Sequence, residues 1–289
     1  MTARVPTLIV HGGAGADPAE GRDELRNGIR EAVLAGWAAL TTGGTALDAV
    51  ESSVRSLEAH PRFNAGRGAV LNAAGGIELD ASIMEGDRLR CGAVGAVTRI
   101  AHPVTLARKI LEDGRHVLLV GDGALAFARQ AGIPECDPAE LITERQRTRY
   151  LERAARGTVG AVALDLRGTI AAATSTGGTA GKLPGRVGDS ALIGCGTYAE
   201  STLGGVSCTG DGEAIIRVVL GRRALDILKA LADPEHAAQG AVDVLVQEGG
   251  GQGGLVLLDW RGRVGWAHST PLMPVGWISP AQPGPVIPF

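Results

Sequence analysis

The chain has 289 residues, a formal net charge of −3, a hydrophobic content of 45% and a charged content of 20%. These values are typical of a globular protein with a sizeable core, and they disfavour a nucleic-acid partner. No run approaches the roughly 18 apolar residues of a membrane helix, and the apolar run at 8–10 is too short for a signal peptide. We therefore expect a cytoplasmic protein without a membrane partner, whose four cysteines stay reduced.

In the first half of the chain, apolar runs alternate with segments whose apolar residues recur at helical spacing. The pattern predicts a buried strand at 5–10, helices at 22–40, 46–59 and 124–130, a further helix that begins at Pro103, and strands at 77–83, 92–98 and 116–120. Thr45 stands at the N-cap position of the second helix. Glycine is about twice as frequent as usual and clusters between these elements, which predicts tight turns or close approaches of the backbone to a ligand.

The second half has a different pattern. Residues 138–156 are polar and rich in arginine, which predicts a surface helix that frays into an exposed connection. Two hairpins follow at 159–175 and 255–268, with helices at 213–232 and 234–246 between them, and the last twenty residues are expected to be irregular. Strands and helices in such blocks favour an α+β layered sandwich over strict βαβ alternation.

Several common catalytic motifs are missing. The sequence has no H-E-x-x-H, G-x-S-x-G or Walker A motif, which excludes the zincin, nucleophile-elbow and P-loop classes. Gly121, Gly123 and Ala126 satisfy a permissive dinucleotide-binding pattern, but no second apolar strand with an acidic residue follows, so a nucleotide site is disfavoured. The six histidines are scattered, and none is singled out as the base of a Ser-His-Asp triad.

Thr158 opens a predicted buried strand directly after the polar connection. A threonine hydroxyl is a weak nucleophile without a nearby base. If the Gly157–Thr158 bond is cut, the new α-amine, with a pKa of about 7.7–8, can accept the hydroxyl proton. Gly157 also tolerates the strained backbone that an N→O acyl shift requires. From chemistry alone, an ordinary strand threonine remains the more frequent alternative.

Several long motifs around and before Thr158 stand in a fixed order over most of the chain. They occupy 11–15, 63–66, 79–81, 157–165, 173–178, 182–190 and 208–210. Together they resemble the isoaspartyl peptidase and plant-type L-asparaginase family of N-terminal-nucleophile hydrolases. The resemblance implies a four-layer αββα sandwich formed by one domain, 1–289, that is autocleaved into an alpha subunit, 1–157, and a beta subunit, 158–289. It also implies a homodimer of precursors that matures to (αβ)₂.

The resemblance further assigns the groups that act on the reacting carbonyl. Thr158 is the nucleophile and, through its amine, the base, while the Thr176 hydroxyl assists it. Thr209 and Gly210 supply a hydroxyl and a backbone N–H to an oxyanion hole, a type of donor whose loss costs about 10²–10³ in rate. Asn64 reaches the surroundings of the nucleophile.

Three further residues would recognise the free amino-acid end of the substrate. By resemblance, Arg186 clamps the α-carboxylate, a task that suits the guanidinium fork. Asp189 binds the α-ammonium, and the Gly212 carbonyl accepts a hydrogen bond from the same amine. An internal ion pair between Arg186 and Asp189 is the alternative interpretation.

The resemblance implies no catalytic cofactor, but it implies a structural sodium ion on a loop after the second helix. The backbone carbonyls that would hold the ion belong to Leu57, Glu58, His60, Phe63, Ala65 and Arg67.

The chain departs from the family pattern near the expected pocket. Gly181 stands where asparagine is common, and Asp211 stands where an uncharged or smaller residue is common. Pro271 and Leu272 replace an acidic–glycine pair, and the connection before Thr158 is short. We hypothesise that the Asp211 charge helps to hold a cationic substrate amine.

The predicted function is hydrolysis of the side-chain amide of L-asparagine and of β-aspartyl dipeptides through a Thr158 acyl-enzyme. One alternative in the same fold is a glycosylasparaginase, although the motifs at 157–161 and 182–185 fit the peptidase branch better. A second alternative is an unprocessed, non-catalytic binding protein, in which the short connection prevents cleavage.

Overall fold

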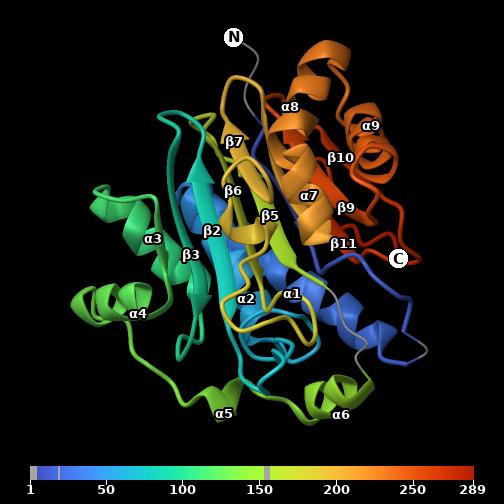
Figure 1. Ribbon diagram of the computed structural model, residues 1–289. Helices are drawn as coiled ribbons and strands as arrows, with labels where there is room; N and C mark the ends of the chain where they lie inside the picture. Colours follow the sequence, from blue (N-terminus) through green and yellow to red (C-terminus); the bar gives the residue numbers. More distant parts are fainter. Residues whose placement is uncertain (1–4, 19, 153–156) are drawn as a thin grey trace.

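The computed structural model describes residues 5–18, 20–152 and 157–289. Two β-sheets lie face to face between two layers of helices (Figure 1). This architecture confirms the predicted α+β, four-layer αββα sandwich. Within the described residues, no helix is both long and apolar enough to cross a bilayer.

The larger sheet has seven strands and carries the Gly157–Thr158 bond near its centre. Its order is β11 (Val275–Ile278), β1 (Thr7–His11), β5 (Val159–Leu164), β6 (Ile170–Thr176), β2 (Leu79–Glu85), β3 (Arg90–Val97) and β4 (Leu118–Val120). Neighbouring strands are antiparallel, except that β3 and β4 are parallel. The smaller sheet is antiparallel, in the order β10 (Val264–His268), β9 (Gly253–Asp259), β8 (Gly204–Gly210) and β7 (Thr197–Glu200).

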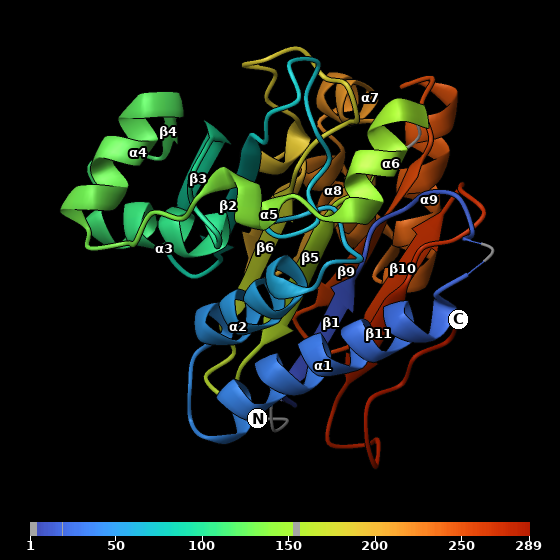
Figure 2. The same cartoon turned by 90° about the horizontal axis from the view of Figure 1, so that it is seen from below.

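Helices cover the outer face of each sheet (Figures 1 and 2). The large sheet packs against α1 (Arg22–Thr41), α2 (Ala46–Ala59) and α3 (Pro103–Asp113), and α4 (Gly121–Gln130) lies beside β3 and β4. The small sheet packs against α8 (Leu220–Leu231) and α9 (Pro234–Gln247), with the short α7 (Gly212–Val218) before them. The polar segment forms α5 (Pro138–Leu141) and α6 (Glu144–Glu152) at one end of the sandwich.

Burial follows the alternation of side chains along each strand. On β1, Leu8 and Val10 pack with α1 and α2, whereas Ile9 lies between the sheets with Val162 and Val256. All five side chains are fully buried, and such burial contributes about 1.5–3 kcal/mol for each aliphatic side chain. The strands that carry the site therefore belong to a rigid core on both faces.

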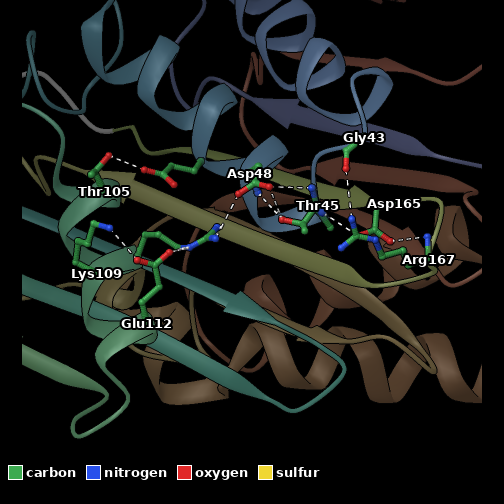
Figure 3. A network of polar contacts seen from close by, with 11 residues as sticks. Gly43, Thr45, Asp48, Thr105, Lys109, Glu112, Asp165 and Arg167 are labelled. Carbon is green, nitrogen blue, oxygen red and sulfur yellow. Dashed lines mark hydrogen bonds and ion pairs between the residues drawn. The ribbon is translucent and has the colours of Figure 1, made fainter.

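The start of α2 is fixed by a polar network shown in Figure 3. Thr45 and Asp48 form a capping box, as the N-cap prediction implies. Asp165, at the turn between β5 and β6, accepts a hydrogen bond from the backbone N–H of Ala46 at 3.0 Å and from that of Arg167 at 2.9 Å. The network thus ties the helix to the hairpin that begins at Thr158.

Several element predictions were wrong in detail. The sequence predicted one helix over 138–156, but the structure has two short ones, and 153–156 lie outside the described residues. The helix predicted at 213–232 breaks at Val219, whose φ of 51° is left-handed. Three strands were missed: the short β7; β8, which is rich in small and polar residues; and β11, which lies in the proline-rich tail and pairs with β1.

Candidate active site

Thr158 and Thr176 lie side by side at the ends of two paired strands. Because Val159 is opposite Ser175 in the antiparallel register, Thr158 is opposite Thr176. Both threonines are buried, and the Thr158 hydroxyl donates to the Thr176 hydroxyl at 3.4 Å. The sequence prediction that Thr176 lies on the strand next to the nucleophile is therefore confirmed.

Two donors point at the carbonyl oxygen of Gly157. The Asn64 side-chain amide donates to it at 2.7 Å, and the Thr176 hydroxyl donates at 2.8 Å. Since Thr176 has one hydroxyl hydrogen, it accepts from Thr158 and from the Gly178 N–H, which is 2.9 Å away. Asn64 is held in turn, because its Nδ2 also donates to the Gly178 carbonyl at 2.7 Å. The peptide bond before Thr158 is thus polarised by fixed donors.

The turn after β1 presses against this peptide bond. Gly13 has a φ of 102°, and a Cβ placed on it would lie 2.9 Å from the Thr158 nitrogen. Gly157 itself has a φ of 154°. Any larger residue at Gly13 would combine a strained backbone with a collision at the bond to be cut, so the glycine is required by the close approach.

Thr209 and Gly210 end β8 on the facing sheet. The backbone N–H of Ala14 donates to the Thr209 hydroxyl at 3.0 Å, which links this strand end to the turn against Thr158. Gly210 has a φ of 139°, and a Cβ there would lie 2.3 Å from the Gln252 carbonyl oxygen. Gly210 also lines the same cavity as Gly157 and Asn64. The structure therefore brings the predicted oxyanion residues to the scissile bond.

Arg186, Asp189 and Gly212 converge at a second point. A Cβ on Gly212 would lie 2.6 Å from Arg186 Nη2 and 2.8 Å from Asp189 Oδ1. Among the described residues, the ion-pair partner of Arg186 is Glu213 at 2.9 Å, not Asp189, so the internal pair considered from the sequence does not form. Asp189 Oδ2 is buried without a hydrogen-bond partner in the described part of the chain. A buried carboxylate oxygen without a partner is stabilised by a positive charge placed beside it.

Burial raises the pKa of the Asp189 carboxyl to about 7, although the Arg186 guanidinium opposes the rise. A cation that binds beside such a buried carboxyl stabilises its ionised form. A substrate ammonium would supply that charge, whereas an uncharged substrate would not.

Two supporting residues were not assigned a role from the sequence. Asp80 on β2 is fully buried and accepts from the backbone N–H groups of Ala96 at 2.8 Å and Gly188 at 2.9 Å. Burial raises the pKa of Asp80, and the nearby Lys182 ammonium opposes the rise. Because Gly188 lies between Arg186 and Asp189 in the chain, Asp80 fixes the loop that presents both. Its position in the motif at 79–81 was the only sequence signal.

His11, the last residue of β1 and the first of the motif at 11–15, begins a buried chain of hydroxyl groups. The chain runs from His11 Nε2 through Ser207 (2.9 Å), Thr174 (2.7 Å), Thr197 (2.5 Å) and Ser82 (2.8 Å) to the Ser190 carbonyl (2.7 Å). Each hydroxyl has one proton to donate, and two backbone carbonyls accept from the chain: that of Ser190, and that of Gly196 at 3.2 Å from the Thr174 hydroxyl. Burial lowers the pKa of His11 to about 3, which keeps the ring neutral.

Two departures from the family pattern have a structural reading. Gly181 has a φ of 71° with open space beside it, a conformation that asparagine also tolerates, so the exchange preserves the turn. Asp211 Oδ2 accepts from the Gln252 backbone N–H at 2.8 Å. The carboxylate thus braces the loop beside Gly210, and its proposed contact with a substrate amine stays a hypothesis.

The segment predicted to hold sodium extends from the last turn of α2, at Leu57, to Arg67. A Cβ on Gly66 would lie 2.5 Å from the Glu58 carbonyl oxygen, and one on Gly68 would lie 2.6 and 2.8 Å from those of Pro61 and Phe63. Of the six carbonyls named from the sequence, those of Leu57, Glu58 and His60 each accept a backbone hydrogen bond within the segment, from His60, Arg67 and Phe63. Hard cations take oxygen ligands of this kind.

Comparisons with known proteins agree with this geometry. A family model described as asparaginase matches residues 4–156 and 148–285. An isoaspartyl peptidase/L-asparaginase of Danio rerio is 44% identical over 96% of this chain and 93% of its own length. One from Mus musculus is 48% identical over 88% of this chain and 82% of its own length, and a plant-type L-asparaginase of Pyrococcus abyssi is 42% identical over 91% and 93%.

Proposed function

Because this chain belongs to the asparaginase family, we propose that it cleaves itself before Thr158 and then hydrolyses the side-chain amide of L-asparagine and of β-aspartyl dipeptides. The observation that carries the proposal is the Gly157 carbonyl, which receives two hydrogen bonds while the Thr158 hydroxyl lies beside it. The positions of the remaining site residues are consistent with self-cleavage and with amide hydrolysis.

Self-cleavage begins when the Thr158 oxygen attacks the Gly157 carbonyl carbon. The negative charge that develops on the carbonyl oxygen falls where Asn64 and Thr176 already donate. Collapse breaks the C–N bond and leaves an ester, and the amine leaves with a proton. Water then hydrolyses the ester, which frees the 1–157 and 158–289 chains.

Amide hydrolysis uses the freed Thr158. Its α-amine takes the hydroxyl proton as the oxygen attacks the substrate amide carbon, and Thr209 with the Gly210 N–H stabilises the oxyanion. The leaving nitrogen takes the proton, and water releases aspartate from the acyl-enzyme. Arg186 and Asp189 hold the α-carboxylate and α-ammonium, so only substrates with both groups free are positioned.

Gel electrophoresis and mass spectrometry test the first step. We expect purified protein to resolve into chains that correspond to 1–157 and 158–289, the second beginning Thr-Val-Gly. The Thr158→Ala variant should stay intact and inactive. A wild-type chain that remains whole after days at neutral pH would favour the non-catalytic alternative.

Product assays test the substrate. Aspartate release from L-asparagine and β-aspartyl-leucine is expected. Release of sugar from a glycosylated asparagine, with neither of the other two substrates cleaved, would favour the glycosylasparaginase alternative.

We also propose that the loop after α2 holds a structural sodium ion through the backbone carbonyls of the six residues at 57, 58, 60, 63, 65 and 67. The segment supplies backbone carbonyl oxygens, and Asn64, which contacts Gly157, lies within it. The ion would order the loop and take no part in the chemistry. The unfolding temperature should be higher in sodium chloride than in choline chloride at equal ionic strength, and equal temperatures would contradict the proposal.

A further inference from the structure

A cavity of about 830 Å³ opens beside the scissile bond. Gly157, Asn64 and Gly210 line its inner end, whereas of the described residues Arg186 and Asp189 do not line it. In the proposed function, those two residues bind the aspartyl half of the substrate. A leaving group that extends away from them passes Gly210 and enters the cavity.

The size of the cavity exceeds what asparagine needs. Asparagine releases ammonia, a group the size of one water molecule. Sites that enclose whole organic ligands have volumes of about 300–1,000 Å³. The cavity therefore matches a leaving group that carries a side chain.

One wall of the cavity is apolar and fixed. Pro18, Leu25, Pro271 and Leu272 line it, and the Leu25 and Leu272 side chains are each 8% exposed. Gly15 and Leu272 exchange two backbone hydrogen bonds of 2.9 and 3.1 Å, which join the two loops that form the wall. Pro271 and Leu272 stand where the resemblance leads us to expect an acidic–glycine pair, so they add apolar surface at the expected place of polar residues.

Among the described residues, the charged side chains that line the cavity are Glu20, Arg62 and Arg145. Arg62 pairs with Glu24 at 3.1 Å, and Arg145 donates to the Arg62 carbonyl at 3.0 Å. A cationic leaving group is disfavoured because its ammonium group would lose water against the apolar side chains of the lining.

We propose that this cavity is a subsite for the leaving residue, and that it selects β-aspartyl dipeptides whose second residue is large and apolar. The inference rests on the proposed amidohydrolase function. It adds a preference among dipeptides that the reaction itself does not determine.

The test compares three dipeptides on the processed enzyme: β-aspartyl-leucine, β-aspartyl-glycine and β-aspartyl-lysine. We expect kcat/KM for the leucine peptide to exceed that for the glycine and lysine peptides by about ten-fold or more, since one methylene in an apolar pocket discriminates on that order. Leu25→Ala and Leu272→Ala should each lower the leucine-to-glycine ratio by about three-fold or more. Leu166→Ala, at an exposed turn, is the matched control.

The ratio is taken within one preparation, so the amount of active enzyme cancels even if a variant folds poorly. A wild-type ratio near one, or a ratio that neither variant lowers, overturns the subsite while turnover of β-aspartyl-glycine leaves the proposed function standing. No turnover of any dipeptide or of asparagine overturns both.

Discussion

At the scale of single residues, the site depends on groups whose partners are fixed before any substrate arrives. Asn64 is an example, because three of its contacts hold one rotamer: it donates to Gly157 and Gly178 and accepts from the Val70 N–H at 2.9 Å. Preorganised donors of this kind need no reorganisation when charge develops. Both the scissile carbonyl and the loop after Thr176 are therefore set by one side chain.

Asn64→Ala should slow self-cleavage by about 10²–10³, the usual cost of one oxyanion donor. The reason is the loss of one of the two hydrogen bonds to the Gly157 carbonyl. The appearance of the 158–289 chain on a time-resolved gel gives the rate, with Asn27→Ala on the exposed face of α1 as the control. If both variants were cleaved at the wild-type rate, the Thr176 hydroxyl alone would polarise the Gly157 carbonyl.

Asp189 gives the enzyme a pH dependence. With a pKa of about 7, its carboxyl is protonated below neutrality in the free enzyme, so binding of a substrate ammonium strengthens as pH rises through 7. The Thr158 amine, with a pKa of about 7.7–8, must also lose its proton. We therefore expect that, at acid pH, uptake of two protons lowers kcat/KM for asparagine, whereas uptake of one proton lowers kcat. The difference arises because bound substrate keeps Asp189 ionised.

The corresponding measurement is the pH dependence of kcat and of kcat/KM from pH 5 to 9, a range of about two units on either side of neutrality that contains both pKa values. Asp189→Asn is expected to lower kcat/KM and to lose one proton from its acid limb. Acid limbs of the same slope for kcat and kcat/KM in the wild type would show that Asp189 does not titrate in this range.

At the scale of elements, the break between α7 and α8 carries a local strain. Val219 joins the two helices with a φ of 51° and ψ of 51°, and it is exposed. A β-branched residue in this left-handed conformation costs about 1–2 kcal/mol. Val219→Gly should therefore raise the free energy of unfolding by about 1 kcal/mol, and urea unfolding of an uncleaved Thr158→Ala background would measure it. Val246→Gly, within α9 and similarly exposed, should instead lower it.

The sequence allowed most elements and the site to be predicted, for different reasons. Helices such as α2 have both an apolar period and a cap, so their bounds were predicted to the residue. Strand β8 was missed because its residues are small and polar, and its strand conformation depends on pairing with β9 and on the buried hydroxyl chain through Ser207. The Arg186–Glu213 pair was missed because the two residues are distant in the chain and adjacent only after folding.

At the scale of the whole molecule, the two expected chains interleave within one sheet. Strand β1 belongs to 1–157 and lies between β11 and β5 of 158–289, while β6 of the second chain pairs with β2 of the first. Separation would break three full strand pairings and open the core between the sheets. The cleaved chains should therefore elute together in size-exclusion chromatography and separate only in denaturant. Separate elution in buffer would contradict this topology; light scattering of the same peak tests the expected (αβ)₂ dimer.

The pH dependence of stability is also a property of the whole molecule, because two buried groups act in opposite directions. The folded pKa of His11, about 3, is below its ordinary value of 6.5, so its contribution is complete above 6.5 and is lost as pH falls toward 3. The folded pKa of Asp189, about 7, is above 3.8, so its contribution is complete below 3.8 and is lost as pH rises toward 7. Between these limits the two slopes cancel, each being at most about 1.4 kcal/mol per pH unit.

Removal of one group should expose the other. In an uncleaved Thr158→Ala background, Asp189→Asn should make the free energy of unfolding rise more steeply with pH than in the parent between about 4.5 and 6.5. The rise reflects the proton that His11 binds only in the unfolded chain, since its buried ring stays neutral when folded. Urea titrations at three pH values within this window measure the slope. An Asp189→Asn profile with the same slope as the parent would mean that the Asp189 carboxyl keeps an ordinary pKa in the folded chain.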